Sequence, residues 1–246
     1  MRLFGVITLF LINSLFSQNL IDNNGLKQGK WKKFYENSQN IQFEGEFLND
    51  KPIGIFTYYN PDGKISARMA HFTDSTSRIE IYHEDGSLMT DGIYLNKMKD
   101  STWLNYTRNG NLSSLESYKN DLLNGISITF YISDEFESDR VFRKSNYLMG
   151  KLDGDYFEFF PSAKMKIKGQ YQKGIPIGQW SEYYNTGKIY KTYKYKEGKI
   201  HGWLYMYRDD GKIASKSLFK SGVLMRGKEL EEYLNYCQKN NLNPDF

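Results

Sequence analysis

The sequence has few of the residues that build metal and redox centres. It contains one cysteine, Cys237, and three histidines, His71, His83 and His201, among 246 residues. One cysteine cannot form an internal disulfide, and the histidines are far apart in the sequence, without the spacing of metal ligands. The glycines recur at a regular period, so they indicate turns and not a phosphate-binding loop. We therefore expect no metal, no cofactor and no catalytic residues.

The sequence also has no large excess of charge of one sign, and its mean hydropathy is low. The formal net charge is +4, and the mean hydropathy is −0.65. These values exclude a polytopic membrane protein and give no sign of a nucleic-acid-binding surface. We expect a protein that is not an enzyme. A carbohydrate-active enzyme that uses the paired carboxylates Asp153 and Asp155 is the alternative.

Residues 1–17 differ in composition from the rest of the chain. Arg2 precedes an apolar run from Leu3 to Leu11, and small and polar residues follow up to Ser17. This pattern is typical of a signal peptide with cleavage between Ser17 and Gln18, whereas an uncleaved anchor helix would need about 20 apolar residues. The segment predicts export to the periplasm or the cell exterior of a bacterium, with residues 18–28 as a linker.

The remaining sequence is an internal repeat of about 24 residues. We number positions from the first residue of each unit, so that +5 is the fifth residue after it. The starts are Gly29, Gly54, Ser77, Ser101, Gly125, Gly154, Gly178 and Gly202. Position +5 is aromatic in all eight units: Phe34, Tyr59, Tyr82, Tyr106, Phe130, Phe159, Tyr183 and Tyr207. The chain from 29 to 226 is therefore expected to form one array of eight repeats.

Each repeat has the pattern of a β-hairpin. Position +9 is glycine in five units, and a three-residue loop at +7 to +9 that ends in glycine would pair +5 with an apolar residue at +11. With regular alternation, +5, +11 and the aromatic +17 share one face and form the principal core. The apolar residues at +2 fall on the other face unless a β-bulge intervenes. We predict an all-β fold, an elongated single-layer antiparallel meander of eight hairpins.

The repeats resemble a known family. Phe43 to Phe47 followed by Gly54, and Lys168 to Tyr171 followed by Gly174, Gly178 and Trp180, are similar to the MORN repeat and especially to its bacterial variant. The resemblance implies a repeat fold. Some proteins with such repeats are known as YwqK-type antitoxins, while others are structural or membrane-associated.

The repeat pattern ends before residue 227, and a helix is predicted for part of 227–246. Leu230, Tyr233, Leu234 and Cys237 recur at helical spacing, and acidic residues precede Lys239. The charges suit the helix dipole. A repeat array needs capped ends, so we expect the helix to cover the last hairpin. A helix that binds a partner is the alternative.

Two segments could carry a binding function. Asp134 to Asp139 form an acidic insertion without the residue order of an EF-hand, so a solvated loop is expected. The stretch from Lys188 to Lys199 alternates lysine with tyrosine. We take Lys188, Tyr190, Lys194 and Lys196 as candidate contacts with a partner.

The predicted function is that of an exported, monomeric, non-catalytic scaffold that binds another protein of the cell envelope. The alternatives are attachment to anionic lipid or glycan at an envelope surface, and an antitoxin of the YwqK type.

Overall fold

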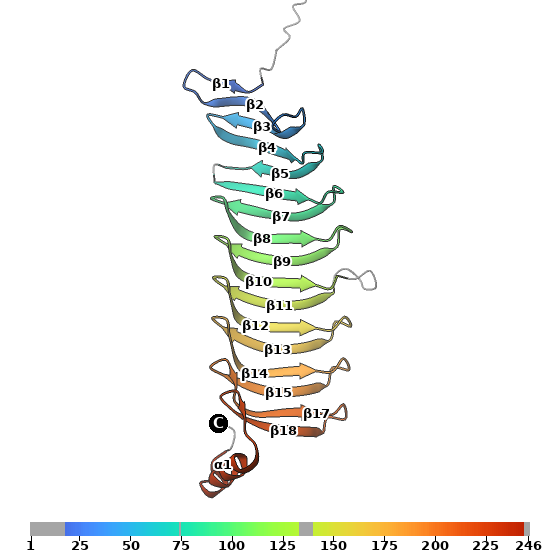
Figure 1. Cartoon of the computed structure of the whole chain (residues 1–246), viewed down its shortest axis with the longest axis vertical. Helices are drawn as coiled ribbons and strands as arrows, with labels where there is room; N and C mark the ends of the chain where they lie inside the picture. The colour runs from blue at the N-terminus through green and yellow to red at the C-terminus, as the bar shows by residue number, and fades with distance from the viewer. Residues whose placement is uncertain (1–17, 74, 133–139, 244–246) are drawn as a thin grey trace, which may run out of the picture. The chain divides into compact units, whose positions relative to one another are not determined.

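A computed structural model describes residues 18–73, 75–132 and 140–243. The predicted signal peptide and the acidic insertion lie outside these ranges. The described residues form antiparallel β-strands and one C-terminal helix, and the strands divide into two compact units, residues 1–74 and 75–246. The prediction of an all-β meander of hairpins is confirmed (Figure 1).

The first unit contains repeats one and two. Its strands are β1 (Leu20–Ile21), β2 (Lys27–Phe34), β3 (Ile41–Leu48), β4 (Lys51–Tyr59) and β5 (Ile65–His71). Each strand pairs with the next in an antiparallel ladder. The predicted linker, residues 18–28, includes β1 and the first two residues of β2.

The second unit contains repeats three to eight, and its strands also pair in sequence order. Its elements are β6 (Thr76–Tyr82), β7 (Leu88–Leu95), β8 (Met98–Tyr106), β9 (Leu112–Lys119), β10 (Leu122–Phe130), β11 (Val141–Leu148), β12 (Lys151–Phe159), β13 (Met165–Gln172), β14 (Ile175–Tyr183), β15 (Ile189–Lys196), β16 (Lys199–Ile200), β17 (Gly202–Tyr207), β18 (Ile213–Lys220), β19 (Val223–Leu224) and α1 (Gly227–Lys239). β15 pairs with both β16 and β17.

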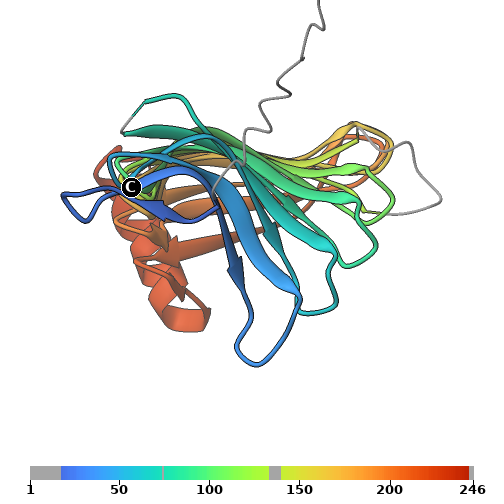
Figure 2. The ribbon, with the colours of Figure 1, turned by 90° about the horizontal axis from the view of Figure 1, so that it is seen from above.

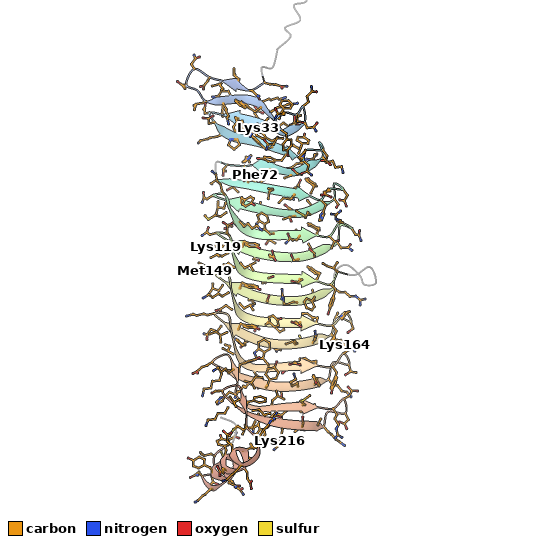
Figure 3. The ribbon with its side chains drawn as sticks, in the orientation of Figure 1. Lys33, Phe72, Lys119, Met149, Lys164 and Lys216 are labelled. Carbon is orange, nitrogen blue, oxygen red and sulfur yellow. The ribbon has the colours of Figure 1, made fainter. Side chains whose placement is uncertain are left out.

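Two kinds of connection alternate along the second unit. The three-residue loops are closed as predicted: Tyr184 N–H donates to Lys188 O, and Gly187, with φ of 91°, donates to Tyr184 O. The other connections are two-residue turns with positive φ at both positions, such as Lys173 and Gly174, which is typical of type I′ hairpins. The loops lie along one edge of the sheet and the turns along the other (Figures 1 and 2). Figure 3 marks the loop edge by Lys164 and the turn edge by Lys119 and Met149.

The pairing of +5 with +11 is confirmed, but the prediction that +17 shares their face is wrong. In the seventh repeat Tyr183 pairs with Ile189, while Glu182 pairs with Lys191, so that Tyr190 is an extra residue. The same register shift occurs in all eight hairpins. This bulge reverses the alternation. The side chains at +13, +15 and +17 therefore lie on the same face of the sheet as those at +2 and +4. The side chains at +5 and +11 lie on the opposite face.

The buried core consequently differs from the predicted one. Among the repeat positions, +2 most often holds a buried apolar side chain: Trp103 is 1% and Trp180 is 5% exposed, whereas the +5 aromatics are half-buried or, like Phe34, exposed. Other buried +2 residues are Phe56, Ile79 and Ser127. The expectation that the +5 aromatics form the principal core is wrong, because it assumed uninterrupted alternation along each strand.

The +2 rings join with the +17 rings into a ladder across the strands. In the second unit Trp180 contacts Tyr171 and Tyr195 with ring centroids 5.3 and 5.5 Å apart, and Trp103 contacts Tyr94 and Tyr118 at 5.0 and 6.2 Å. All four contacts are edge-on, a favourable geometry for aromatic pairs. In the first unit the ladder is Trp31, Phe47, Phe56 and His71. We call this side of each unit the ladder face.

Glycine at +15 makes room for the ring of the next repeat. A Cβ atom on Gly169 would lie 2.2 Å from the ring of Trp180, and one on Gly92 would lie 2.2 Å from the ring of Trp103. The Trp180 indole N–H donates to Ile177 O at 3.1 Å, so its polar atom is satisfied. Ser145 occupies +15 opposite the smaller ring of Tyr156. Residue size at +15 is thus matched to the ring that covers it.

The predicted helix is present as α1, and it begins after an extended Arg226. Cys237 is 2% exposed and is its buried residue, so it is a packed side chain. Met225, just before α1, donates its N–H to Leu218 O, and both side chains are buried. α1 lies beyond the last strands, on the turn side (Figures 1 and 2). Within the described residues, no helix is long and apolar enough to span a membrane.

Deletion of residues 228–246 should cause self-association. β18 is paired on its outer side only at Phe219 and Lys220, by β19. Leu218 and Met225 are buried at this end of the sheet, so we expect loss of the helix to expose them beside a free strand edge, which is a template for edge-to-edge pairing. Light scattering should detect oligomers of the shortened protein and none of the full chain. A stable monomer would favour the partner-binding role of the helix.

Candidate binding surface

The ladder face of the second unit carries tyrosine–glutamate pairs beside the rings. The hydroxyl of Tyr118 donates to Glu116 at 2.9 Å, that of Tyr193 to Glu182 at 2.9 Å, and that of Tyr156 to Glu158. Burial raises the pKa of Tyr156 and Tyr193, and the neighbouring carboxylates raise both further. These carboxylates are therefore engaged in holding the ladder.

Tyr118 should ionise later than an ordinary tyrosine. Burial first, and then the hydrogen bond to Glu116 and the charge of its carboxylate, together raise the pKa of Tyr118 from 10.0 to about 12. Because the folded-state pKa is the higher one, the stabilisation is complete below pH 10 and is lost as the pH rises through about 12. Comparison of ultraviolet absorbance titrations of the wild type and Tyr118→Phe should assign a step near pH 12 to this residue. A difference that titrates near pH 10 would contradict the contact.

The opposite side of the second unit carries one continuous row of directly paired residues at +3 and +14. We call this side the row face. The row runs from β6 to β18 through Glu80, Asp91, Leu104, Leu115, Ile128, Lys144, Phe157, Lys168, Ser181, Thr192, Tyr205 and Lys216. Its chemistry changes along the sheet: the first two residues are acidic and the next three are aliphatic. The last seven contain three lysines, with one aromatic residue between the first two and Ser181, Thr192 and Tyr205 between the last two.

The charged side chains at the two ends of the row differ in whether they form ion pairs. At the first end Arg78 binds Asp91 through two hydrogen bonds of 2.8 and 2.7 Å and lies 3.8 Å from Glu80. At the other end Lys144 and Lys168 are exposed and face Phe157 between them. Lys216 lies over the ring of Trp203 at 4.6 Å. The row face is therefore neutralised at β6 and β7 and positive at β11 to β18.

Surface grooves occur where a repeat begins. One of about 350 Å³ in the second unit is lined by Lys168, Gly169, Gln170, Gln179, Ser181 and Tyr183. One of about 330 Å³ in the first unit includes the equivalent Glu44, Gly45, Glu46, Ile55 and Thr57. Both lie at the register shift between adjacent repeats, where the ladder of strand hydrogen bonds is interrupted. The repeat thus produces the same groove with different charge.

The four predicted contact residues do not form one cluster. Lys188 and Tyr190 are at the loop end of β15, where Lys188 lies 3.9 Å from the Asp209 carboxylate and Tyr190 packs on Tyr184 at 5.0 Å. Lys194 and Lys196 are exposed toward the turn end of β15. Alternation places both on the row face, opposite Tyr195. Their role as contacts stays a prediction.

The sequence reasoning missed Lys144, Phe157 and Lys168. The available signal was the recurrence of lysine at +14 in the fifth, sixth and eighth repeats, once the insertion in the fifth repeat is counted. From the sequence alone, position +14 could not be assigned to a face of the sheet, because the bulge that precedes it was not known.

The other candidate chemical groups lie apart from the row. His83 donates from Nε2 to the backbone carbonyl of Tyr106 at 3.3 Å, and His201 accepts from Ser221 N–H at 3.1 Å. Asp155 accepts from Gln170, and Asp153 from the N–H of Lys173, both at 2.9 Å. Among the residues with described positions, no three His, Cys, Asp or Glu side chains are grouped to hold a metal. The acidic insertion, Asp134 to Asp139, lies outside those residues.

Two solved structures with some likeness to the chain share little sequence with it. One is the crystal structure of TarM, at 12% identity and a TM-score of 0.31, over 54% of this chain and 22% of that one. Another is a porin-like protein from Bacteroides uniformis ATCC 8492, at 10% identity and a TM-score of 0.15, over 80% of this chain and 92% of that one. The chain thus spans about a fifth of the length of TarM, and both TM-scores are too low to indicate a shared fold. No curated protein matches the chain.

A family model does match. The MORN repeat variant matches residues 99–120 and 176–197. Each match begins two residues before a repeat start, Ser101 or Gly178, and covers a hairpin with its Trp at +2. The two matches are therefore in the same phase as the structural repeat. At these two places the chain contains hairpins that match the MORN repeat variant, which suggests a repeat-built binding scaffold.

Proposed function

We propose that this protein is a non-catalytic scaffold that binds another protein through the row face of its second unit. The observation that carries the proposal is the row itself, with its apolar centre and unequal ends. Twelve strands at about 4.8 Å spacing give the row a length of about 50 Å. A surface of that length suits a macromolecule better than a small ligand, which binds in a concave pocket that buries most of its area.

The proposed location is the cell envelope of a bacterium, with the mature chain exported as a monomer. The support is the sequence of residues 1–17, which has the order of a signal peptide. Intact-mass measurement of native material should give a chain that begins at Gln18. A protein that still begins at Met1 and stays in the cytoplasm would contradict export and would favour the YwqK-type antitoxin function.

Binding to a protein can be tested in the native envelope. Crosslinking should give a discrete protein adduct, and Lys194→Glu with Lys196→Glu should weaken it, because both lysines lie on the row face. Sedimentation with anionic vesicles at low and high salt is the companion measurement. Salt-sensitive vesicle binding, or recovery of glycan, without any protein adduct would overturn the proposal in favour of surface attachment.

A further inference from the structure

We propose that the partner segment is an extended acidic polypeptide that lies across β11 to β18 on the row face. The inference rests on the proposed function and adds the chemistry of the partner. The residues that would hold it are Lys144, Phe157, Lys168, Tyr205 and Lys216, which lie in one line of paired positions through Ser181 and Thr192.

The charge on this half of the row face is open to a partner. Lys144, Lys168 and Lys194 are exposed and have no carboxylate partner among the described residues. The two carboxylates on the same face of these strands, Asp153 and Asp155, accept hydrogen bonds from the Lys173 backbone and from Gln170. At the other end of the row, Arg78 and Asp91 form an ion pair within the sheet, whereas these lysines have no such pair in the part of the chain that the structure describes. An acidic partner would complete the charge balance.

The apolar residues between the lysines distinguish a polypeptide from other anions. Phe157 is paired with Lys144 on one side and Lys168 on the other, and Ile128 is paired with Lys144. A partner on this line must therefore offer apolar groups within about 5 Å of its anionic groups. A polypeptide carries both kinds of side chain at that spacing, whereas an unsubstituted glycan does not, and a lipid surface is a plane and not a line.

The spacing of the lysines suggests the conformation of the segment. Lys144 and Lys168 are two strands apart, about 9.6 Å at the usual strand spacing. A polyproline II helix returns to the same side every three residues, about 9.3 Å. Acidic residues at the first and fourth positions of such a segment would meet Lys144 and Lys168, and one at the tenth position would meet Lys216, which lies four strands beyond Lys168. The residues between the first two would reach Phe157.

The test uses fluorescence anisotropy of the mature chain, residues 18–246, with a labelled peptide of four Glu-Pro-Leu units. Lys144→Glu with Lys168→Glu should weaken binding at least tenfold. The matched control is Lys164→Glu with Lys239→Glu, which changes the net charge equally at a loop and at the end of α1, and it should bind as the wild type does. Peptides with Lys in place of Glu, or with the four Glu residues contiguous, should bind more weakly.

Three outcomes would overturn the inference. They are no binding of the acidic peptide, equal weakening by both double variants, and competition by a polyuronate or by anionic vesicles in place of the peptide. If the crosslinked protein adduct still forms in the native envelope, the inference fails while the proposed function stands. If neither the peptide nor an envelope protein binds, both fail.

Discussion

Trp180→Ala should lower the free energy of unfolding by about 3 to 5 kcal/mol, the usual cost of truncating a large core side chain. Trp180 is 5% exposed, and its ring contacts Tyr156, Tyr171 and Tyr195. Chemical denaturation of the variant and the wild type measures the difference.

The matched control is Tyr183→Ala, three residues later on β14. Tyr183 is half-buried on the row face, so its loss should cost about 1 kcal/mol. A larger loss for Tyr183→Ala than for Trp180→Ala would mean that the +5 aromatics are the core after all, and that the bulge does not place the faces as described.

Gly169→Ser should destabilise the protein by about 1 to 3 kcal/mol, because the new Cβ would overlap the Trp180 ring and overpack the site. The natural pair of Ser145 and Tyr156 suggests a rescue. Gly169→Ser combined with Trp180→Tyr reproduces that pair one repeat later, and Glu182 stands where Glu158 accepts the hydroxyl of Tyr156. The double variant should therefore be more stable than the sum of the single changes predicts.

A double-mutant cycle from denaturation curves measures this coupling. We expect a favourable coupling of about 1 kcal/mol or more between the two positions. Additive effects would show that the size of the residue at +15 and that of the ring at +2 are independent, and that the glycine serves another purpose.

Much of the fold follows from the sequence because the repeat is strong. The aromatic at +5 and the glycine at +9 fix a three-residue loop, and the loop fixes the pairing of +5 with +11, as Tyr183 and Ile189 show. The helix after residue 227 follows from its spacing of apolar residues and its end charges. These features depend on local turn and helix chemistry, which a single sequence carries.

The faces could not be predicted because a bulge leaves no clear mark in the sequence. The extra residue at +12 is Tyr190 in one repeat and Ser66 in another, and neither residue type signals a bulge. One extra residue turns the side chains that follow it to the other face of the sheet, so the observed core lies on the opposite face from the predicted one. The glycine at +15, present as Gly45, Gly92 and Gly169, was the available clue that a ring lies against the backbone there.

The candidate surface was predicted in part. Lys194 and Lys196 do lie on the row face, but Lys188 and Tyr190 are at the loop end, where Lys188 is near Asp209 and Tyr190 is near Tyr184. The line from Lys144 to Lys216 depends on the register of seven strands. Cross-strand register links residues many positions apart, so a search for local charge patterns does not find it.

Site-specific photo-crosslinking tests most directly whether the row face is the binding side. A photoreactive residue in place of Lys168 or Gln179, which line the groove on the row face, should give a protein adduct in the native envelope. The same residue in place of Pro176, paired with Tyr171 of the ladder, should give none. An adduct from Pro176 and none from Lys168 or Gln179 would contradict the account and place the partner on the ladder face.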